Sequence, residues 1–440
     1  MAALPTSNVS LSVAVIGGGI GGLTAAIAMR KAGHKVTVKN TYLIDITQVF
    51  EKYSLSGEAG AAVGLGFNTI NYLESLGFDS TRAKICRIKD SQILDGRTLE
   101  LLQVMPVAGT GGTFFRPDLR EELRRVADSP AQLPDQGVVD EAHASVLPCR
   151  LLEHTEVVGI DPEQGIVRLA DGSQAEADLI IAADGVHSSV MSVVLGEPSP
   201  ALRSSTTATR TVIPVAKLKQ NPFAQIMAAE PGRSTFSVAP DGKRYLLGYW
   251  CHDFEYLNIV LYALEDIPGM VIHTMRGETT REQLAAALNE FHPDLGTVCE
   301  HLLEVLPLWR LYTRAPAARY SRGRLVAIGD AAHAMLSHLG QGANSAILDA
   351  AALGTLFEDL PDQSPETISH RLRLFDEIRV PYNSAVQIWS ETPMFEQPTK
   401  KNADIQAILP DFKLPGKSGM IRRAELLRIS PLPRWFPNLY

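Results

Sequence analysis

Apolar, glycine-rich and helical segments alternate at the start of this chain. Residues 11–16 form a continuous apolar run, residues 17–22 are rich in glycine, and residues 23–32 are small and apolar with helical spacing. A second apolar run follows at 35–38. A strand, a tight turn, a helix and another strand in this order predict the unit that opens a parallel sheet.

The middle of the chain alternates in a different way. Between about residues 203 and 265, apolar and polar positions alternate with the period of a half-buried strand. We expect antiparallel strands here, at 206–215, 235–238, 245–249 and 257–262. This region is therefore predicted to be a second domain, which helices near 280–306 complete.

Further elements are predicted on both sides of this region. Helices are expected at 67–77, 116–128, 343–357 and 364–395, and a buried strand at 324–328. Residues 129–148 hold three prolines and few periodic apolar positions, so a loop is expected there.

Composition narrows the class of protein. The length of 440 residues exceeds that of a typical domain, so at least two packed units are expected. A net charge of −8 argues against a nucleic-acid partner, because such partners are bound by basic surfaces. The four cysteines are widely spaced, which favours reduced thiols in a cytoplasmic protein over a metal site. Neither a signal peptide nor a membrane span is expected.

The glycine-rich turn has the spacing of a dinucleotide-binding motif. Gly17, Gly19 and Gly22 stand between an apolar strand and an alanine-rich helix. Glycines at these positions allow a tight turn, close approach of a pyrophosphate to backbone N–H groups, and close packing of helix on strand. The motif therefore predicts a dinucleotide site at the start of this helix.

Such a site also calls for an acidic residue at the end of the second strand, to accept hydrogen bonds from a ribose. Here the strand at 35–38 runs into Lys39, whereas residues 49–52 have the pattern expected of its continuation. We therefore hypothesise an insertion of about eleven residues after Val38, with Glu51 as the ribose ligand. Asp45 in that role, or no acid at all, is the alternative.

Two further strand ends carry aspartate beside glycine. Asp184 and Gly185 close one apolar run, and Gly329 and Asp330 close another. The second pair is followed by the glycine-rich stretch 340–344, which opens a helix. One Asp-Gly pair is common in turns, but three strand-end clusters in this order are hard to explain as turns alone.

With these three motifs the chain resembles the single-component flavoprotein aromatic hydroxylases of the para-hydroxybenzoate and salicylate hydroxylase type. The resemblance covers roughly residues 11–360 and is strongest to the salicylate hydroxylase-like branch over 323–350. That branch includes many fungal monooxygenases of secondary metabolism. The resemblance implies FAD as the cofactor and NADPH or NADH as a transient co-substrate.

The resemblance also assigns cofactor residues. Asp330 is expected to hold the ribityl or pyrophosphate side of FAD, and Arg116 to reach the cofactor from the start of its helix. Asp184 and Gly185 are expected to support FAD and transient nicotinamide binding. Backbone N–H groups at the helix start 340–344 would stabilise the negative charge of reduced flavin. The full expected cofactor set is Gly17, Gly19, Gly22, Glu51, Gly64, Arg116, Asp184, Gly185, Asp330, Gly340, Gly342, Ala343 and Asn344.

The chain departs from the family pattern at three places. Ser337 stands where the family usually has proline. Serine keeps the backbone carbonyl at this position but makes the loop less rigid. Met191 stands where arginine is common after the Asp-Gly strand. The third departure is the absent acid after Val38.

The expected fold is α/β, with a Rossmann-like FAD-binding domain built on a parallel sheet, a mostly antiparallel β-sheet substrate domain, and C-terminal helices. We predict a first part of the FAD-binding domain at 1–200 and its second part at 307–360. The substrate domain is predicted at 201–306 and a helical tail at 361–440.

The expected reaction is hydroxylation or oxidative dearomatisation of a phenolic molecule, with oxygen transferred through the flavin C4a-hydroperoxide. A phenolate needs a cation or a hydrogen-bond donor to hold it. Arg210 and Tyr249 on the expected substrate sheet are the preferred candidates, ahead of Tyr245 and His252. The flavin-loop histidines, His333 and His338, are more simply interpreted as structural.

Other functions stay open at this point. A reductase or oxidase that transfers no oxygen would share the cofactor pocket, and an inactive flavin-fold protein would result if the insertion after Val38 spoils that pocket. A flavin halogenase is disfavoured because the four tryptophans do not form a Trp-x-Trp-x-Ile-Pro segment. The expected partners are a small aromatic substrate, O2 and NAD(P)H, in a cytoplasmic monomer or homodimer without nucleic acid or metal.

Overall fold

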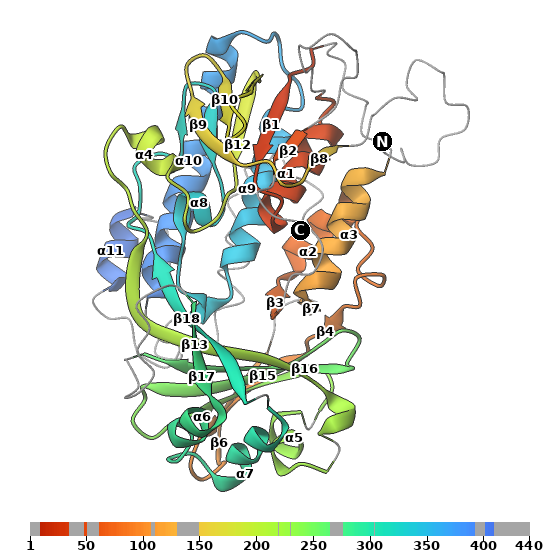
Figure 1. Ribbon diagram of the computed structural model, residues 1–440, viewed down its shortest axis with the longest axis vertical. Helices are drawn as coiled ribbons and strands as arrows, with labels where there is room; N and C mark the ends of the chain where they lie inside the picture. The colour runs from red at the N-terminus through yellow and green to blue at the C-terminus, as the bar shows by residue number, and fades with distance from the viewer. Residues whose placement is uncertain are drawn as a thin grey trace.

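The structure is a computed structural model. It describes residues 9–34, 48–50, 61–106, 111–129, 149–218, 220–228, 230–264, 276–302, 304–391 and 401–408. Figure 1 shows two stacked parts: a parallel sheet with its helices at one end of the long axis, and a broad antiparallel sheet at the other.

The first part is built on a six-stranded sheet. Its strands are parallel except at one edge, where β19 runs antiparallel to β20. The strand that begins the chain, β1, lies in the middle, so the order of crossovers reverses beside it, which is where such sheets bind ligands. In spatial order the strands are β19 (Ser321–Arg322), β20 (Leu325–Ala327), β12 (Leu179–Ala182), β1 (Val13–Ile16), β2 (Gln48–Phe50) and β8 (Arg150–Leu152).

Helices cover this sheet and share one core with it. The helix after β1, α1 (Ile20–Lys31), packs against α9 (Gly342–Leu356) and α3 (Arg116–Asp128). A Cβ at Gly354 would lie 3.1 Å from the Cβ of Ala28, so α1 and α9 cross in close contact. The other helices of this part are α2 (Phe67–Ser75), α4 (Val190–Leu195), α8 (Asp330–His333), α10 (Pro365–Ser390) and α11 (Lys401–Ile408).

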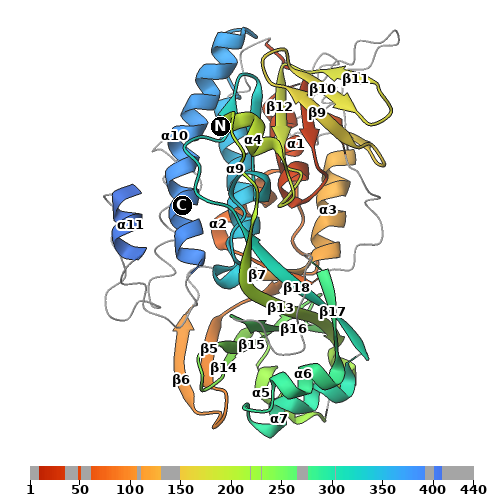
Figure 2. The ribbon, with the colours of Figure 1, turned by 60° about the vertical axis from the view of Figure 1, so that its left-hand side comes forward.

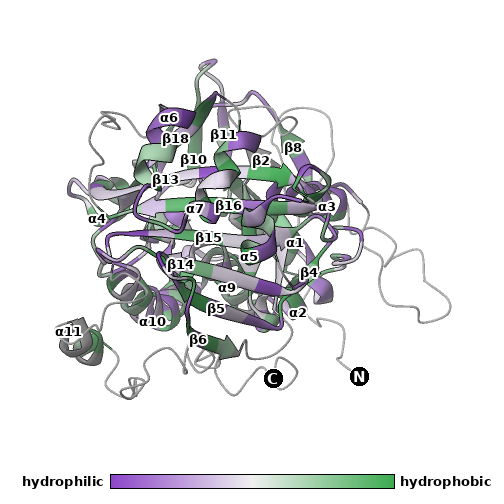
Figure 3. Ribbon diagram, turned by 90° about the horizontal axis from the view of Figure 1, so that it is seen from below, coloured by the Kyte–Doolittle hydropathy of each residue, from purple (hydrophilic) through white to green (hydrophobic). Residues whose placement is uncertain are grey.

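The second part is an eight-stranded sheet, seen from below in Figure 3. All neighbouring strands are antiparallel except β14 and β5, which are parallel. In spatial order the strands are β17 (Arg276–Thr280), β18 (Val305–Thr313), β13 (Leu202–Pro214), β16 (Tyr256–Ala263), β15 (Arg244–Cys251), β14 (Arg233–Val238), β5 (Asp90–Asp95) and β6 (Leu101–Pro106).

The two faces of this sheet have different neighbours. Short helices cover the face that points away from the parallel sheet (Figure 2), and a core that includes Ile213, Phe223, Leu284 and Leu295 joins them to it. They are α5 (Pro222–Met227), α6 (Arg281–Ala287) and α7 (Pro293–Gly296), with the 3-10 turns η2 (Val215–Lys217) and η3 (Thr297–His301). The opposite face carries a smaller aromatic cluster and faces the first part.

Two three-stranded sheets complete the fold. One, of order β3 (Ala62–Leu65), β7 (Gly112–Phe115) and β4 (Cys86–Arg87), lies beside the larger sheet. The other, of order β11 (Gln174–Glu176), β10 (Ile166–Leu169) and β9 (Val157–Asp161), precedes the strand β12. A last 3-10 turn, η4 (Ser337–Leu339), precedes α9.

The predicted fold class is confirmed, with two local differences. The larger sheet takes in β5 and β6 from the first half of the chain, because β5 pairs in parallel with β14, a contact that local periodicity cannot reveal. The helices expected near 280–306 are α6, α7 and η3, after which β18 begins at Val305. The predicted strand 35–38 and almost all of the predicted loop 129–148 lie outside the described residues. The domain boundaries stay a prediction.

None of the helices among the described residues combines the length and the apolar character needed to cross a bilayer.

A buried histidine ties three elements of the first part together. His34 follows α1, accepts a hydrogen bond at Nδ1 from the backbone N–H of Leu11 (3.3 Å), and lies 2.7 Å through Nε2 from the carbonyl oxygen of Phe357. This arrangement is satisfied by the neutral ring with its proton on Nε2. Burial lowers the pKa of His34 to about 4, against a partial opposing effect of the Phe357 carbonyl.

This histidine predicts a loss of stability in mild acid. The unfolded chain binds a proton at His34 below about pH 6.5, whereas the folded chain does so only below about pH 4, so the free energy of unfolding falls as pH drops between these values. The expected slope reaches about 1.4 kcal/mol per pH unit. Urea titrations across this range measure it. The variant His34→Gln should have a flatter profile, and His370→Gln, at an exposed position, should keep the steep one.

Candidate active site

One cavity of about 1240 Å³ opens where the carboxyl ends of the parallel strands face the larger sheet. It brings together motifs that lie more than 300 residues apart in the chain, from Gly19 to Asn344. The predicted residues that line it are Gly19, Gly64, Arg116, Gly185, Arg210, Tyr249, Asp330, Gly340, Gly342, Ala343 and Asn344. Gly17, Gly22 and Asp184 lie just behind or beside this wall, and Glu51 and its alternative Asp45 lie outside the described residues.

The three glycines of the first motif, Gly17, Gly19 and Gly22, differ in the space that surrounds them. Gly17 has a φ of +99°, and a Cβ there would lie 2.4 Å from the carbonyl oxygen of Ala183. A Cβ at Gly22 would lie 1.9 Å from the carbonyl oxygen of Gly17. At Gly19 a Cβ would meet no atom within 4 Å. Gly17 and Gly22 are therefore required by packing, while Gly19 faces open space at the start of α1, where a pyrophosphate can approach the helix N-terminus.

A buried carboxylate holds the third motif in place. Asp349 of α9 accepts hydrogen bonds from the N–H of Gly329 (3.0 Å), from Arg379 Nε (2.8 Å) and from Asn383 Nδ2 (3.0 Å), and its Oδ2 lies 2.6 Å from His333 Nε2. Burial alone would raise the pKa of Asp349, but His333, Arg379 and these hydrogen bonds hold it well below its usual range. His333 is fully buried behind the wall, as its structural interpretation expects.

This network fixes the aspartate that faces the cavity. Gly329 has a φ of +59°, which turns the chain so that Asp330 starts α8 on the cavity wall. Desolvation raises the pKa of Asp330, partly offset by its electrostatic interactions with His333, Arg116 and Arg314. Its carboxylate lies next to Gly342, where a Cβ would be 3.8 Å from Oδ1. An acceptor and a helix N-terminus thus face the same space.

The side-chain amide of Asn344 is fully hydrogen-bonded within the protein and stabilises the start of α9. Its Nδ2 donates to the carbonyl oxygens of Gly64 (3.1 Å) and Gly340 (2.9 Å), and its Oδ1 accepts from the N–H of Gly66 (2.9 Å) and the hydroxyl of Thr69 (2.8 Å). Both hydrogens and both lone pairs of the amide are therefore engaged. The side chain joins β3, α2 and the turn before α9.

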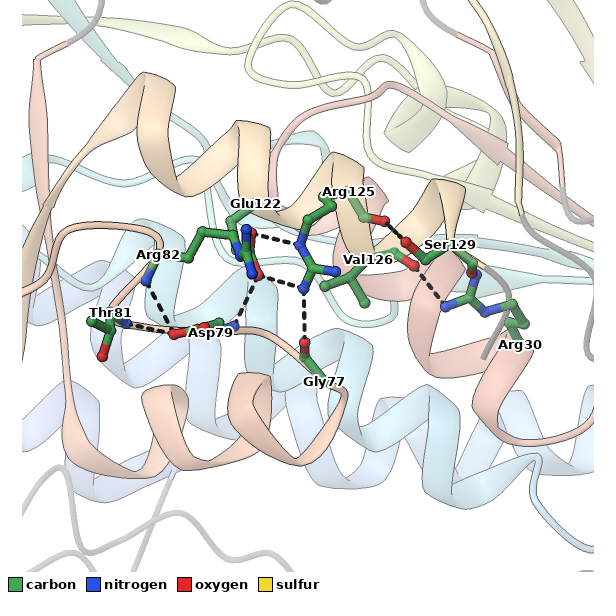
Figure 4. A network of polar contacts seen from close by, with 9 residues as sticks. All are labelled: Arg30, Gly77, Asp79, Thr81, Arg82, Glu122, Arg125, Val126 and Ser129. Atoms are coloured by element: carbon green, nitrogen blue, oxygen red, sulfur yellow. Dashed lines mark hydrogen bonds and ion pairs between the residues drawn. The ribbon is translucent and has the colours of Figure 1, made fainter. Parts of the chain in front are cut away.

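The helix that carries Arg116 is anchored by a second buried carboxylate, shown in Figure 4. Glu122 accepts hydrogen bonds from Arg125 (2.6 and 2.8 Å) and from the N–H of Asp79 (3.0 Å), and it is almost completely buried. One turn after Arg116, Arg120 Nε donates to the carbonyl oxygen of Gly18 (3.3 Å). Arg120 was missed in the sequence, although its i, i+4 spacing from Arg116 places both on one face of α3.

At the other end of the cavity lie the predicted substrate residues. Arg210 of β13 donates from Nη2 to the hydroxyl of Ser337 (3.1 Å), and its Nε is buried with no hydrogen-bond partner among the described residues. Tyr249 donates its hydroxyl to the carbonyl oxygen of Ala62 (2.8 Å), and burial strongly raises its pKa.

The lesser candidates differ in position. Tyr245 lines the cavity and its hydroxyl lies 2.6 Å from His338 Nδ1. His252 is not among the lining residues; its Nδ1 lies 2.6 Å from Asp118 Oδ2 on α3.

Within the described residues, no group of three histidines, cysteines, aspartates or glutamates is arranged to hold a metal ion.

The glycine geometry predicts different outcomes for two alanine variants. Gly22→Ala is expected to lower the free energy of unfolding by about 1–3 kcal/mol, because the new methyl group collides with the Gly17 carbonyl. Gly19→Ala is expected to change it by no more than about 1 kcal/mol but to weaken FAD binding. Urea unfolding and fluorescence titration of the apoprotein with FAD measure the two effects. Equal FAD affinity in Gly19→Ala and the unaltered chain would contradict this assignment.

The buried network predicts a large effect of neutralising Asp349. Asp349→Asn leaves the Arg379 guanidinium buried without its carboxylate, so the free energy of unfolding should fall by about 3–5 kcal/mol. Asp359→Asn, an exposed aspartate close by in the chain, is the matched control and should change it by less than about 0.5 kcal/mol. A loss below 1 kcal/mol at Asp349 would show that the network is not coupled as the distances indicate.

The chain is similar in sequence to a known family and to curated proteins. Residues 10–360 match the family model described as "FAD binding domain". An "FAD-dependent monooxygenase phomE'" of Diaporthe leptostromiformis is 31% identical over 353 residues, which is 78% of this chain and 85% of that protein. "Hispidin-3-hydroxylase" of Neonothopanus nambi is 26% identical and covers 84% of this chain and 85% of its own.

Solved structures share the fold. The structure titled "Salicylate hydroxylase substrate complex" has a TM-score of 0.68 at 21% identity, covering 96% of this chain and 98% of that one. Klebsiella pneumoniae HpxO complexed with FAD and uric acid has a TM-score of 0.70 at 18% identity, covering 96% and 98%. The family match and the 31% identical relative identify the family: the chain belongs to the FAD-dependent monooxygenases, flavoproteins with an FAD-binding domain.

Proposed function

We propose that this enzyme uses FAD, NADPH or NADH, and O2 to hydroxylate or oxidatively dearomatise a phenolic small molecule. The observation that carries the proposal is the single cavity that joins the glycine and aspartate wall to an aromatic end with Arg210. Its volume of about 1240 Å³ exceeds the roughly 300–1,000 Å³ of an ordinary ligand pocket. There is room for a dinucleotide and an aromatic ring together.

The residues of the wall suit FAD. Gly19 leaves open space at the N-terminus of α1, Asp330 offers a carboxylate to hydroxyl groups, and the N-terminus of α9 at Gly342 favours negative charge. When bound, FAD supplies the redox chemistry and delivers activated oxygen to the substrate. Arg116 adds a cation on the same wall, while Asn344 keeps the turn before α9 in place.

The residues of the larger sheet suit an ionised aromatic substrate. The wall there includes Phe236, Val260 and Trp309, which exclude water from the reacting ring. Arg210 and Arg310 add positive charge, and no carboxylate from this sheet is found among the described lining residues. An acidic phenol that binds here meets a cation, which favours the phenolate, and a phenolate ring is the stronger nucleophile toward an electrophilic oxygen.

Tyr249 contributes mainly through its ring. Its hydroxyl is already donated to Ala62, and its raised pKa keeps the phenol protonated. We therefore assign it a packing contact with the substrate and assign the polar contact to Arg210.

The names of the relatives support a phenolic substrate. One relative is named as a hydroxylase of hispidin, and others as monooxygenases of 3-amino-4-hydroxybenzoate, from Streptomyces cremeus and Streptomyces platensis. We also propose that this enzyme acts in secondary metabolism.

The assignment of Arg210 predicts a defined kinetic change. Arg210→Met removes a charge-assisted hydrogen bond worth about 1.5–3 kcal/mol, so the KM for an ionised phenol should rise roughly 10- to 150-fold. FAD content, read from visible absorption, should be unchanged. Arg168→Met, at an exposed position in β10, is the matched control and should keep the original KM. An unchanged KM in Arg210→Met would remove Arg210 from the substrate site.

Isotope incorporation separates the proposed reaction from its alternatives. The holoenzyme is supplied with NADPH or NADH, a panel of phenols and ¹⁸O2, and the products are examined by mass spectrometry. One ¹⁸O atom in the product is expected. Oxidation of NAD(P)H without labelled product indicates a reductase or oxidase, and a protein that stays colourless after addition of FAD indicates an inactive flavin fold.

A further inference from the structure

Three side-chain contacts fasten the turn η4 to the larger sheet. Ser337, the first residue of η4, has its Oγ 3.1 Å from Arg210 Nη2 and 2.9 Å from the hydroxyl of Tyr262. The next residue, His338, lies 2.6 Å through Nδ1 from the hydroxyl of Tyr245. All five residues line the cavity. The turn that leads into α9 is therefore tied to the face that we assign to the substrate.

The two tyrosines form a rigid pair on that face. Tyr245 and Tyr262 are register partners on the neighbouring strands β15 and β16. Their rings stack with centroids 4.7 Å apart and an interplanar angle of 22°. Such cross-strand aromatic pairs hold each other in place, so the hydroxyl of Tyr262 meets Ser337 from a fixed position.

The hydroxyl group of Ser337 links Arg210 and Tyr262 by two hydrogen bonds. A guanidinium can only donate, so the Ser337 oxygen accepts from Arg210. The serine oxygen has two lone pairs, so the hydrogen bond between Ser337 and Tyr262 can run in either direction; when Ser337 donates, the phenolic O–H of Tyr262 is left to donate to a ligand. Arg210 Nε is a second donor that is buried with no partner among the described residues. A buried donor without an acceptor is costly, and because Arg210 lines the cavity, a ligand bound there can supply that acceptor.

We infer that Ser337 is a positioning residue whose hydroxyl holds Arg210 and Tyr262 as a paired donor site for one ionised oxygen of the substrate. This inference rests on the proposed function, because it places an acidic aromatic at this end of the cavity. Because Arg210 and Tyr262 are both hydrogen-bonded to Ser337 of η4, a substrate oxygen bound by them is held at a fixed distance from η4. The position of the substrate ring relative to α9 is then fixed as well. Tyr262 is thereby added to the substrate contacts.

The backbone at Ser337 makes a sharp test available. Ser337 is the first residue of η4, and Leu336 before it has φ −67° and ψ 149°. Proline is favoured at the first position of a helical turn, and its preceding residue adopts this extended conformation. Ser337→Pro therefore removes the hydroxyl and stiffens the loop, whereas Ser337→Ala removes the hydroxyl and leaves the loop as flexible as before. Ser337→Thr keeps the hydroxyl.

The experiment measures ligand binding to the FAD-loaded protein without any NAD(P)H. Salicylate is the ionised probe and salicylamide its neutral counterpart, and the flavin difference spectrum reports each dissociation constant. Ser337→Ala, Ser337→Pro and Tyr262→Phe should each weaken salicylate binding roughly 5- to 20-fold and leave salicylamide nearly unchanged. Ser337→Thr should restore most of the preference for the anion. The double variant Ser337→Ala/Tyr262→Phe should lose less than the product of the single losses.

Other outcomes would overturn the inference. If Ser337→Pro binds like the unaltered holoenzyme while Ser337→Ala does not, loop stiffness is the cause. If salicylate and salicylamide lose affinity equally, the residue supports the fold only. If the unaltered holoenzyme discriminates no ionised aromatic from its neutral counterpart, the paired donor site does not exist. The failure of the proposed function is distinct, because it is the absence of labelled oxygen in the product while the binding differences persist.

Discussion

The carboxylate of Asp349 is the interaction on which the cofactor-facing wall depends. Removing a charged group from water is expensive unless its charge and its lone pairs are satisfied. Here Arg379 supplies the opposite charge, and donors from three different segments converge on two oxygens. The loop before α8, the helix α9 and the helix α10 are thereby fixed relative to one another. The turn at Gly329, with its φ of +59°, is held in this conformation by the hydrogen bond from the Gly329 N–H to Asp349.

The helix α9 carries this constraint to the other side of the cavity. Five residues before Asp349, Asn344 fastens the same helix to β3 and α2. One helix therefore sets the position of Asp330 through one side chain and that of Gly64 through another. Its N-terminus, where the backbone N–H groups face the cavity, cannot shift without disturbing both attachments. The position of that helix end therefore depends on two side chains whose polar atoms are hydrogen-bonded within the protein.

Much of the fold, and the meeting of the glycine and aspartate motifs at one cavity, could be predicted because the information is local. Gly17, Gly19 and Gly22 mark a turn whose geometry depends on their own backbone, and Asp330 follows directly on a buried strand. At the other end of the cavity, Arg210 was a candidate from the sequence, but its grouping with Tyr262 and Ser337 could not be predicted in this way. Arg210, Tyr262 and Ser337 are separated by 52 and 75 residues in the sequence, and only the register of β13 against β16 and the position of η4 bring them together. Asp349 could have been recognised in the sequence as a lone acidic residue in a helix of small and apolar residues. Its ion-pair partner Arg379 could not, because it lies in another helix, α10.

The strand β2 bears on the hypothesis of an insertion after Val38. In a parallel sheet, residues at the same level of adjacent strands reach the same edge together. Val49 is the register partner of Val15, and Phe50 that of Ile16, whose next residue is the glycine that opens the motif. The strand beside β1 is thus formed by residues 48–50, of which Gln48 and Val49 belong to the eleven residues 39–49 of the hypothesised insertion. Glu51 and the segment 39–47 lie outside the described residues, so the ribose contact stays a prediction. Whatever the origin of residues 39–49, residues 48–50 pair with β1 on one side and with β8 on the other, so the strand order around β1 is complete.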